Sequence, residues 1–344
     1  MLIVRPATSV DFDALVRLAK LAGPGFTSLA VGAHILKMRL EKSVDSFAGP
    51  RAISPDHTYL LMLEDTDTGQ VHGLSAVKAQ IGLRDPFFNF RILKIAQKSE
   101  VTNRRFDMDV LLLVNEYAGA TEVGSLFLTI GMRGTGAGRL ISQARYFLMA
   151  ADPDRFADLV ISELRGHVDE KGRSPFWEAV GRKFFLMDFS EADHISAQKD
   201  HQFILDLMPK YPIYAALLPQ EAQDVMGKPH PAGVGARRYL EAEGFRYNGV
   251  IDIFDAGPSV SAPKADIRTI RDSCPVKLSG HMPVNFDEAD PPILTGLLSN
   301  NRIRDFRCVL QRFQLDNGHV RLTSETIDAL RVGTGDTIRL WIKP

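Results

Sequence analysis

Residues 126–149, LFLTIGMRGTGAGRLISQARYFLM, combine residue types that suit the binding of a phosphate group. An apolar run gives way to a turn rich in glycine and arginine, which leads into a segment with helical spacing. Glycines let a backbone pass close to a ligand, and the N-terminus of the following helix adds a partial positive charge. Arginines in the turn can add charge-assisted hydrogen bonds. The residues that we expect to bind a pyrophosphate are Arg133, Gly134, Thr135, Gly136, Gly138 and Arg139.

Three other interpretations of this turn were weighed. A Walker A loop needs Gly-Lys-Ser/Thr, which the turn lacks. A Rossmann loop follows the first strand of its sheet and has an acidic residue about twenty positions later, whereas this turn follows several expected strands. A plain structural turn remains an alternative, because short glycine patterns often occur without function.

The elements around the turn predict a mixed α/β protein with an antiparallel meander before the glycine loop. An early helix carries apolar residues at three- to four-residue spacing, and an Asp-Thr-Gly turn joins two strands between residues 57 and 82. The expected strands with firm bounds are Leu2 to Arg5, Val110 to Val114, Val123 to Ile130 and Phe185 to Phe189. The expected helices near the turn are Gly138 to Ala150 and residues 174–185.

The second half of the chain differs in composition. It is first helical and then rich in loops, with a helix closed at Gly244 and a Pro/Ser/Ala stretch, Pro258 to Pro263, that predicts a linker. Short strands and one small helix follow. We therefore predict a mixed α/β core at 1–192, a loop-rich segment at 193–258, and a small β-rich unit at 259–344.

The composition excludes several classes of protein. A net charge of -1 gives no support for general binding to nucleic acids or anionic membranes. Cys274 and Cys308 provide neither a disulfide framework nor the CxxC spacing of a metal site. The sequence has no secretory signal and no apolar run of about twenty residues. We expect a cytoplasmic protein without a metal ion or a tightly bound cofactor.

Context gives the glycine turn a more specific interpretation. The start IVRPAT, the R-x-x-G-x-G turn after a central strand and the later PFWEAVG helix together resemble the GNAT acyltransferase fold. The resemblance implies that the turn binds the pyrophosphate of an acyl-coenzyme A. It also implies that backbone groups of the preceding strand, at Leu126, Phe127 and Leu128, hold the pantetheine. The side chains of that strand by themselves fit an ordinary core strand.

Longer blocks narrow the resemblance to the arginine N-succinyltransferase family. The blocks occur in order at residues 25–29, 85–91, 174–193, 206–214, 220–231 and 243–258. Membership would imply transfer of a succinyl group from succinyl-coenzyme A to the α-amine of L-arginine in arginine catabolism, with release of free coenzyme A. The resemblance implies that His230, in the block GKPHP, is the proton donor and that Leu126 contacts the coenzyme. The setting of His230 between two prolines would equally fit a rigid surface turn.

The acceptor site is less defined by the sequence. A carboxylate is needed for the guanidinium of arginine, and a cation for the free carboxylate of the succinyl group. Glu116 and Asn115 are candidates for the first contact, and Arg91 or Arg173 for the second, although these residues would equally fit an exposed loop and solvated surface charges. The run NEYAG at 115–119 departs from the Asn-Asp-His-Thr-Gly-like run of the family, which leaves the acceptor open between arginine, ornithine and another basic amino acid.

A different class of function is a non-catalytic, coenzyme-binding partner subunit. We expect a homo-oligomer or a hetero-oligomer with a related subunit in either case. The presence of both the glycine turn and His230 favours the enzyme.

Overall fold

The computed structural model describes residues 1–23, 29, 31–198, 202–282 and 292–343. The chain forms two compact units. Unit 1 is built from residues 1–79, 123–158 and 264–344, and unit 2 from residues 80–122 and 159–263. The sequence predicted consecutive segments, whereas these units alternate along the chain. Most of the block at 25–29 that supported the family resemblance lies outside the described residues, as do residues 199–201 of the expected helical segment after 193.

Unit 1 contains two groups of strands, and different helices pack on each group. Its helices are α1 (Phe12–Ala22), α2 (Ala33–Ala48), α3 (Ala137–Ala151), α10 (Arg268–Arg271) and α11 (Ser324–Leu330). Its strands are β1 (Leu2–Pro6), β2 (Thr58–Asp65), β3 (Val71–Lys78), most of β6 (Thr121–Leu128), β11 (Cys274–His281), β12 (Ile293–Ser299), β13 (Cys308–Asp316), β14 (His319–Leu322) and β15 (Thr337–Ile342). Short 3-10 turns occur at η1 (Ser9–Asp11), η2 (Ile130–Met132), η3 (Pro153–Arg155) and η6 (Lys264–Asp266).

The first group of strands is an antiparallel arrangement of β1, β2 and β3. Leu60 to Leu63 of β2 are all buried, which is the pattern of a strand covered on both faces. Apolar residues of α1 and α2 pack on one face, and α3 packs on the other. Helix α3 is buried along most of its length and is fixed to α10 by a 2.7 Å hydrogen bond from Gln143 Nε2 to Thr269 Oγ1. The glycine turn therefore begins a rigidly packed helix.

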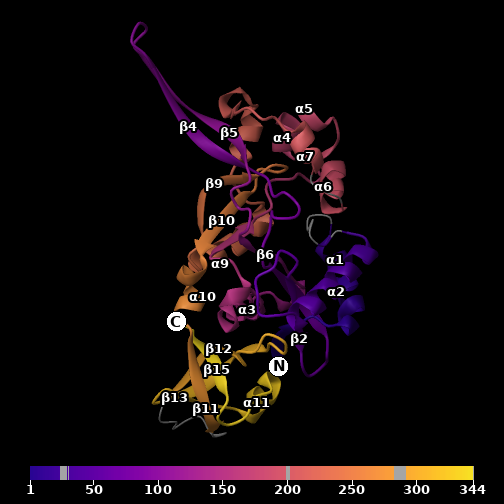
Figure 1. Ribbon diagram of the computed structural model, residues 1–344, viewed down its shortest axis with the longest axis vertical. Helices are drawn as coiled ribbons and strands as arrows, with labels where there is room; N and C mark the ends of the chain where they lie inside the picture. Colours follow the sequence, from indigo (N-terminus) through magenta and orange to yellow (C-terminus); the bar gives the residue numbers. More distant parts are fainter. Residues whose placement is uncertain (24–28, 30, 199–201, 283–291, 344) are drawn as a thin grey trace. The chain divides into compact units, whose positions relative to one another are not determined.

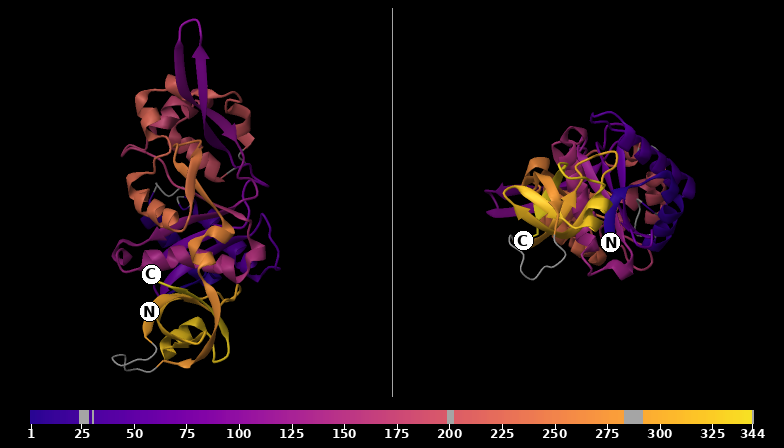
Figure 2. Two further views of the ribbon diagram at one scale, coloured as in Figure 1. Left: turned by 90° about the vertical axis from the view of Figure 1, so that its left-hand side faces the viewer. Right: turned by 90° about the horizontal axis from the view of Figure 1, so that it is seen from below.

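The second group closes into a small barrel. β12 pairs with both β13 and β15, β11 pairs with β15 and β14, and β14 pairs with β13. The ring of five strands surrounds a core to which α11 contributes Ile327 and Leu330 (Figure 2). β13 also pairs with the N-terminal strand, with Ile3 opposite Val309. The expected β-rich character of this part of the chain is observed.

Unit 2 is a second sheet with short helices. Its strands are β4 (Asn89–Ser99), β5 (Arg104–Val114), β7 (Leu159–Glu163), β8 (Ile213–Tyr214), β9 (Arg246–Asp252) and β10 (Pro258–Pro263). Its helices are α4 (Pro175–Ala179), α5 (Gly181–Phe185), α6 (Phe189–Gln198), α7 (Gln202–Leu207), α8 (Gln220–Val225) and α9 (Val234–Ala242), with 3-10 turns η4 (Ala215–Leu217) and η5 (Pro231–Gly233). The strand order is β7-β10-β9-β4-β5-β8, and the first two residues of β6 pair in parallel with β7.

Aromatic residues form the core of unit 2. Phe176 and Trp177 of α4 are fully buried, as expected for core residues, and the ring of Trp177 stacks on Phe254 at 5.4 Å. β4 and β5 continue beyond this core as the long two-stranded hairpin seen in Figure 1. Only the inner end of β5, at Val110 to Val114, was expected from the sequence.

Two local predictions are wrong. Residues Pro258 to Pro263 are not a linker but β10, paired on both edges with β7 and β9. The prolines occupy the two ends of the strand, where a missing N–H interrupts the sheet least. Phe185 to Phe189 is not a strand: Leu186 adopts a left-handed conformation that ends α5, and α6 starts at Phe189. Among the described residues, no helix has the length and apolar character needed to cross a membrane.

Candidate active site

The glycine turn has the backbone conformation of an anion-binding loop. Gly134 and Gly136 have φ of +81° and +91°, in the region that residues with a Cβ adopt only under strain. Gly136 is the N-cap of α3 and supplies no side-chain acceptor. Thr135 fixes the turn from within, since its Oγ1 donates to the carbonyl of Met132 at 2.8 Å. A loop of this shape exposes backbone rather than side chains.

Space and charge around the turn suit a phosphate. A Cβ built on Gly134 would meet no atom within 4 Å, and one on Gly136 would meet only Leu310 at 3.6 Å. The first N–H groups of α3 precede Leu140, whose N–H is bonded to the carbonyl of Gly136, and they lack carbonyl partners within the helix. Arg133 is exposed and Arg139 is half-buried. The turn therefore offers N–H donors, a helix dipole and two cations to a ligand.

The strand before the turn presents backbone groups along one edge. Phe127 directs its carbonyl to β3, because a Cβ on Gly73 would lie 2.7 Å from that oxygen. Thr129 also bonds β3, through the carbonyl of His72 at 2.9 Å. Since backbone groups of successive residues face opposite edges of a strand, those of Leu126 and Leu128 face away from β3. The family resemblance assigned the pantetheine to backbone groups of Leu126, Phe127 and Leu128. Leu126 and Leu128 have the required orientation, whereas Phe127 faces β3 and does not.

His230 is held in the loop between α8 and α9 of unit 2. Its backbone N–H donates to the carbonyl of Arg165 at 2.7 Å, and its Nδ1 accepts the N–H of Ala232 at 3.2 Å. Because Nδ1 is the acceptor, the hydrogen of the neutral ring is on Nε2. The ring faces that of His167 with an angle of 29° between the ring planes and 6.4 Å between the centroids. The donor atom that His230 can offer to a ligand is therefore Nε2.

The surroundings favour the neutral form of His230. Partial burial lowers the pKa of His230, and the nearby positive charges of Arg165 and His167 lower the pKa further. The hydrogen bond from Ala232 acts in the same direction, since protonation would place a second hydrogen on Nδ1. His230 is therefore a neutral hydrogen-bond donor near pH 7.

The sequence-predicted acceptor contacts pair with each other. The guanidinium of Arg91 forms a bidentate ion pair with Glu116, with 2.8 Å between Nε and Oε2. Hydrogen bonding to Glu116 raises the pKa of Arg91. Asn115 is exposed in the turn after β5, where its carbonyl accepts the N–H of Ala118. A substrate guanidinium at Glu116 would have to compete with Arg91.

Unit 2 also buries three carboxyl groups that sequence patterns did not indicate. Glu163 ends β7, Asp252 ends β9, and Asp255 lies in the turn between β9 and β10. Burial raises the pKa of all three, and the charge of Asp252 raises those of Glu163 and Asp255 further. Glu163 is far from Asp252 and Asp255 in the sequence, and the three match no motif, so only the pairing of β7, β10 and β9 brings Glu163 into the region of the other two.

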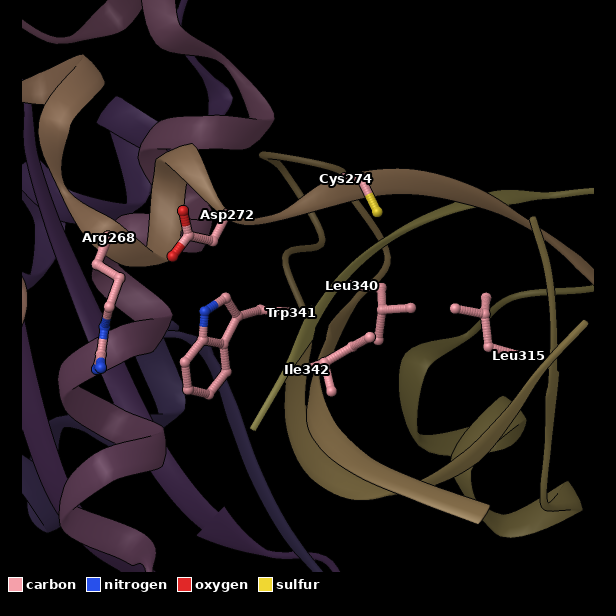
Figure 3. Close-up of a pocket in the computed structure, with 7 residues that line it drawn as sticks. All are labelled: Arg268, Asp272, Cys274, Leu315, Leu340, Trp341 and Ile342. Atoms are coloured by element: carbon pink, nitrogen blue, oxygen red, sulfur yellow. The ribbon is translucent and has the colours of Figure 1, made fainter. Parts of the chain in front are cut away.

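The predicted site residues divide between the units. The glycine turn and Leu126 to Leu128 belong to unit 1, and His230, Asn115, Glu116 and Arg91 belong to unit 2. A cavity of about 290 Å³ in unit 1 contains none of them. As Figure 3 shows, Arg268 and Trp341 line it side by side, with the guanidinium 5.5 Å from the ring centroid, and Cys274 lies near its edge. The sequence did not single out this cavity.

Comparisons with known proteins cover nearly the whole chain. A family model described as "Arginine N-succinyltransferase beta subunit" matches residues 2–269, and its C-terminal-domain counterpart matches residues 281–341. The curated "Arginine N-succinyltransferase" of Escherichia coli (strain 55989 / EAEC) is 40% identical over 340 residues, which cover 99% of this chain and 97% of that protein. The corresponding protein of Shigella flexneri serotype 5b is 39% identical over the same lengths.

A solved structure agrees with these relatives. It is described as "arginine/ornithine succinyltransferase subunit AI" from Pseudomonas aeruginosa and superposes with a TM-score of 0.88. Its sequence is 34% identical, and the match covers 99% of this chain and 98% of that one. The similarity therefore extends through both units.

Proposed function

Because the chain belongs to the arginine N-succinyltransferase family, it is an acyltransferase that moves a succinyl group to arginine, and we propose that succinyl-coenzyme A is the donor. The observation that carries the proposal is the glycine turn at the N-terminus of α3. Two left-handed glycines leave its backbone uncovered at the start of a buried helix. The predicted α/β fold class and the predicted family are confirmed.

We assign the coenzyme pyrophosphate to residues 133–139. The N–H groups at the start of α3 donate to the phosphate oxygens, and Arg133 and Arg139 supply the compensating charge. Leu126 and Leu128 hold the pantetheine through backbone groups that face away from β3. A pantetheine carries amide groups, so it can pair with a strand edge as another strand would.

The chemistry is aminolysis of a thioester. The α-amine of the acceptor attacks the carbonyl carbon, a C–N bond forms and the C–S bond breaks. The nitrogen gives up one proton and the departing sulfur takes one, which leaves the succinyl amide and free coenzyme A. His230 donates a hydrogen bond from Nε2 to the sulfur as negative charge develops there. The guanidinium of arginine keeps its proton at any physiological pH, so the α-amine is the nucleophile.

The acceptor is arginine, with ornithine as a second candidate because of the name of the Pseudomonas relative. Glu116 remains our proposed contact for the acceptor's cationic side chain, and Asn115 lies beside it. Arg91 is already paired with Glu116. To bind the succinyl carboxylate as proposed, Arg91 must first leave this ion pair.

The test is thiol release from succinyl-coenzyme A with arginine, ornithine and lysine in parallel. We expect the highest kcat/KM with arginine. His230→Ala should lower kcat about a hundredfold while coenzyme binding persists. His230→Gln, which retains a donor near the position of Nε2, should lose less than the alanine variant.

Each negative outcome has its own meaning. Coenzyme binding without thiol release with any acceptor would indicate the non-catalytic partner subunit. Full activity of His230→Ala would remove this side chain from the mechanism. Succinyl-coenzyme A would remain the proposed acyl donor.

A further inference from the structure

Two turns of unit 2 contact each other, and both are hydrogen-bonded to the segment that carries His230. One turn leaves β7 through Gly166, and the other joins β9 to β10 through Gly257. A Cβ on Gly166 would lie 2.1 Å from the carbonyl oxygen of Asp255, and a Cβ on Gly257 would lie 2.0 Å from that of Leu164. The two backbones are therefore in direct contact, and no side chain larger than hydrogen fits at either glycine.

The carboxyl group of Asp255 ties these turns together. Its Oδ2 accepts the N–H of Gly166 at 2.7 Å, and its Oδ1 accepts the N–H of Gly257 at 2.8 Å. Asp255 is 8% exposed. Each oxygen thus has one backbone donor, and the two donors come from different turns.

The segment that carries His230 is bonded to the same two turns. The N–H of His230 donates to the carbonyl of Arg165, directly before Gly166. The N–H of Gly227 donates to the carbonyl of Ala256 at 2.9 Å. Ala256 lies between Asp255 and Gly257 and has φ of +56°, an uncommon conformation for a residue other than glycine.

We propose that Asp255 is a positioning residue for His230, because its carboxyl group fixes the two turns whose carbonyls hold the His230 segment. This inference rests on the proposed role of His230 in the reaction. Asp255 accepts the N–H groups of the two peptide units, Arg165–Gly166 and Ala256–Gly257, whose carbonyls accept the N–H groups of His230 and Gly227. Its effect on the reaction passes through backbone hydrogen bonds.

The surroundings of the imidazole depend on the same turn. Arg165 and His167, whose charges lower the pKa of His230, flank Gly166 in the chain. If the turn moves, these charges move as well, and the pKa of His230 changes with them. A defect limited to global stability would not change that pKa in a folded variant. The imidazole pKa therefore distinguishes positioning from a purely structural role.

The carboxyl group of Asp252 supports this arrangement. It accepts the N–H groups of Phe254 and Asp255 at 2.7 and 2.9 Å. Both carboxyl groups thus accept backbone N–H groups of these turns, so the pair organises the backbone.

The experiment compares Asp255→Asn and Asp255→Ala with Glu163→Gln in the full-length protein. Asn keeps the side-chain volume but presents N–H to one of the two backbone donors, so one bond is lost. Glu163 is an equally suitable buried acid for a control, because its partners are the side chains of Asn89 and Ser259 rather than these turns. Thermal melting establishes whether each variant is folded. If Asp255→Ala is not folded, the comparison rests on Asp255→Asn.

For Asp255→Asn we expect kcat to fall by about ten- to a hundredfold, because small displacements at a reacting centre have effects of this size. KM for succinyl-coenzyme A should stay within about twofold. The pKa of His230, followed by NMR of its ring protons, should rise toward the ordinary value of about 6.5. Glu163→Gln should leave all three quantities unchanged.

A folded Asp255→Asn with unchanged kcat and unchanged His230 pKa would overturn the inference. A loss of kcat with an unchanged pKa would assign Asp255 a structural role only. In the His230→Ala background the Asp255 substitution should cost no further activity, because both changes act through one side chain. Full activity of His230→Ala would instead refute the proposed role of His230 in the reaction, so the two failures are distinguishable.

Discussion

The hydrogen bond between the N–H of Ala232 and Nδ1 determines which nitrogen of His230 can act on a substrate. An imidazole that accepts at Nδ1 carries its hydrogen on Nε2, and burial, followed by electrostatic interaction with Arg165 and His167, lowers its pKa and favours the neutral form. At the scale of one residue, the backbone selects the tautomer and the charges select the protonation state.

This arrangement predicts a pH dependence. Because the folded pKa of His230 is lowered, the neutral ring persists to lower pH than in an ordinary histidine. Protonation then breaks the bond to Ala232, so we expect kcat to fall only at a pH below the ordinary histidine pKa of about 6.5. The stability contributed by the neutral ring is complete above the unfolded pKa of histidine. It is lost as the pH falls through the folded pKa of His230. The measurement is kcat against pH at saturating substrates.

His230→Gln is the control for this limb. The acceptor amine also titrates, but its effect persists in the glutamine variant, whereas the limb that belongs to His230 should vanish. Identical profiles of the two proteins would contradict the assignment.

Sequence reasoning could propose residues within continuous blocks but not contacts between blocks. His230 was proposed from the resemblance of its block, residues 220–231, to the family, and its role stays a prediction. The ion pair between Arg91 and Glu116 was not predicted, since it depends on how β4 pairs with β5. The same is true of Asp255, whose partner Gly166 is contributed by a distant turn.

At the scale of elements, we expect a substitution in the glycine turn to weaken coenzyme binding separately from its effect on protein stability. Gly136→Val should destabilise the protein by roughly 1–2 kcal/mol, because a residue with a Cβ resists a positive φ. It should also abolish binding of coenzyme A, measured by isothermal titration calorimetry, because the new side chain covers the N–H groups.

Gly69 offers a matched control in the same unit. It has φ of +67° in the turn between β2 and β3, and a Cβ there would meet nothing within 4 Å. Gly69→Val should lose similar stability and keep coenzyme affinity. Equal affinity in both variants would move the pyrophosphate away from this turn.

Strand β7 ends in a carboxyl group that makes stability depend on pH. Burial, followed by the charges of Asp252 and Glu122, raises the pKa of Glu163 in the folded protein. The stability from its protonated form is therefore complete below the unfolded pKa of about 4.3 and is lost as the pH rises through the folded pKa. Glu163→Gln keeps an oxygen for Asn89 and Ser259 but does not titrate.

Urea unfolding at pH 6 and pH 9 provides the measurement. We expect the free energy of unfolding of the variant to change less between these two pH values than that of the original protein. An equal change in the free energy of unfolding of both proteins would show that Glu163 is ionised in the folded state.

Local patterns predicted elements well where one signal dominated. The apolar spacing of α1, the hairpin of β2 and β3 and the helix after the glycine turn are all observed. β10 was mistaken for a linker because serine, alanine and proline carry little strand preference, yet its centre is buried between β7 and β9. Tertiary pairing here overrides composition.

At the scale of the whole molecule, the C-terminal strands complete the structure of the N-terminal unit. Val309 pairs with Ile3, and Arg339 donates to the carbonyl at the end of α3, at Ala150. We therefore expect a chain that ends at Pro263 to lose amide protection in α3 and β1, measured by hydrogen exchange. Protection equal to that of the full chain would show that unit 1 is complete without these strands.

The interleaving of the units could not be predicted from consecutive composition changes, and it has a consequence for synthesis. On the ribosome, β1 emerges long before its partner β13, because all of unit 2 and much of unit 1 lie between them in the chain. All of the segments of unit 2, including His230 and its supporting turns, emerge before unit 1 can be finished. Until β13 and the other strands of the barrel follow, Ile3 lacks the core in which it is fully buried and can be bound by a chaperone that recognises apolar strands.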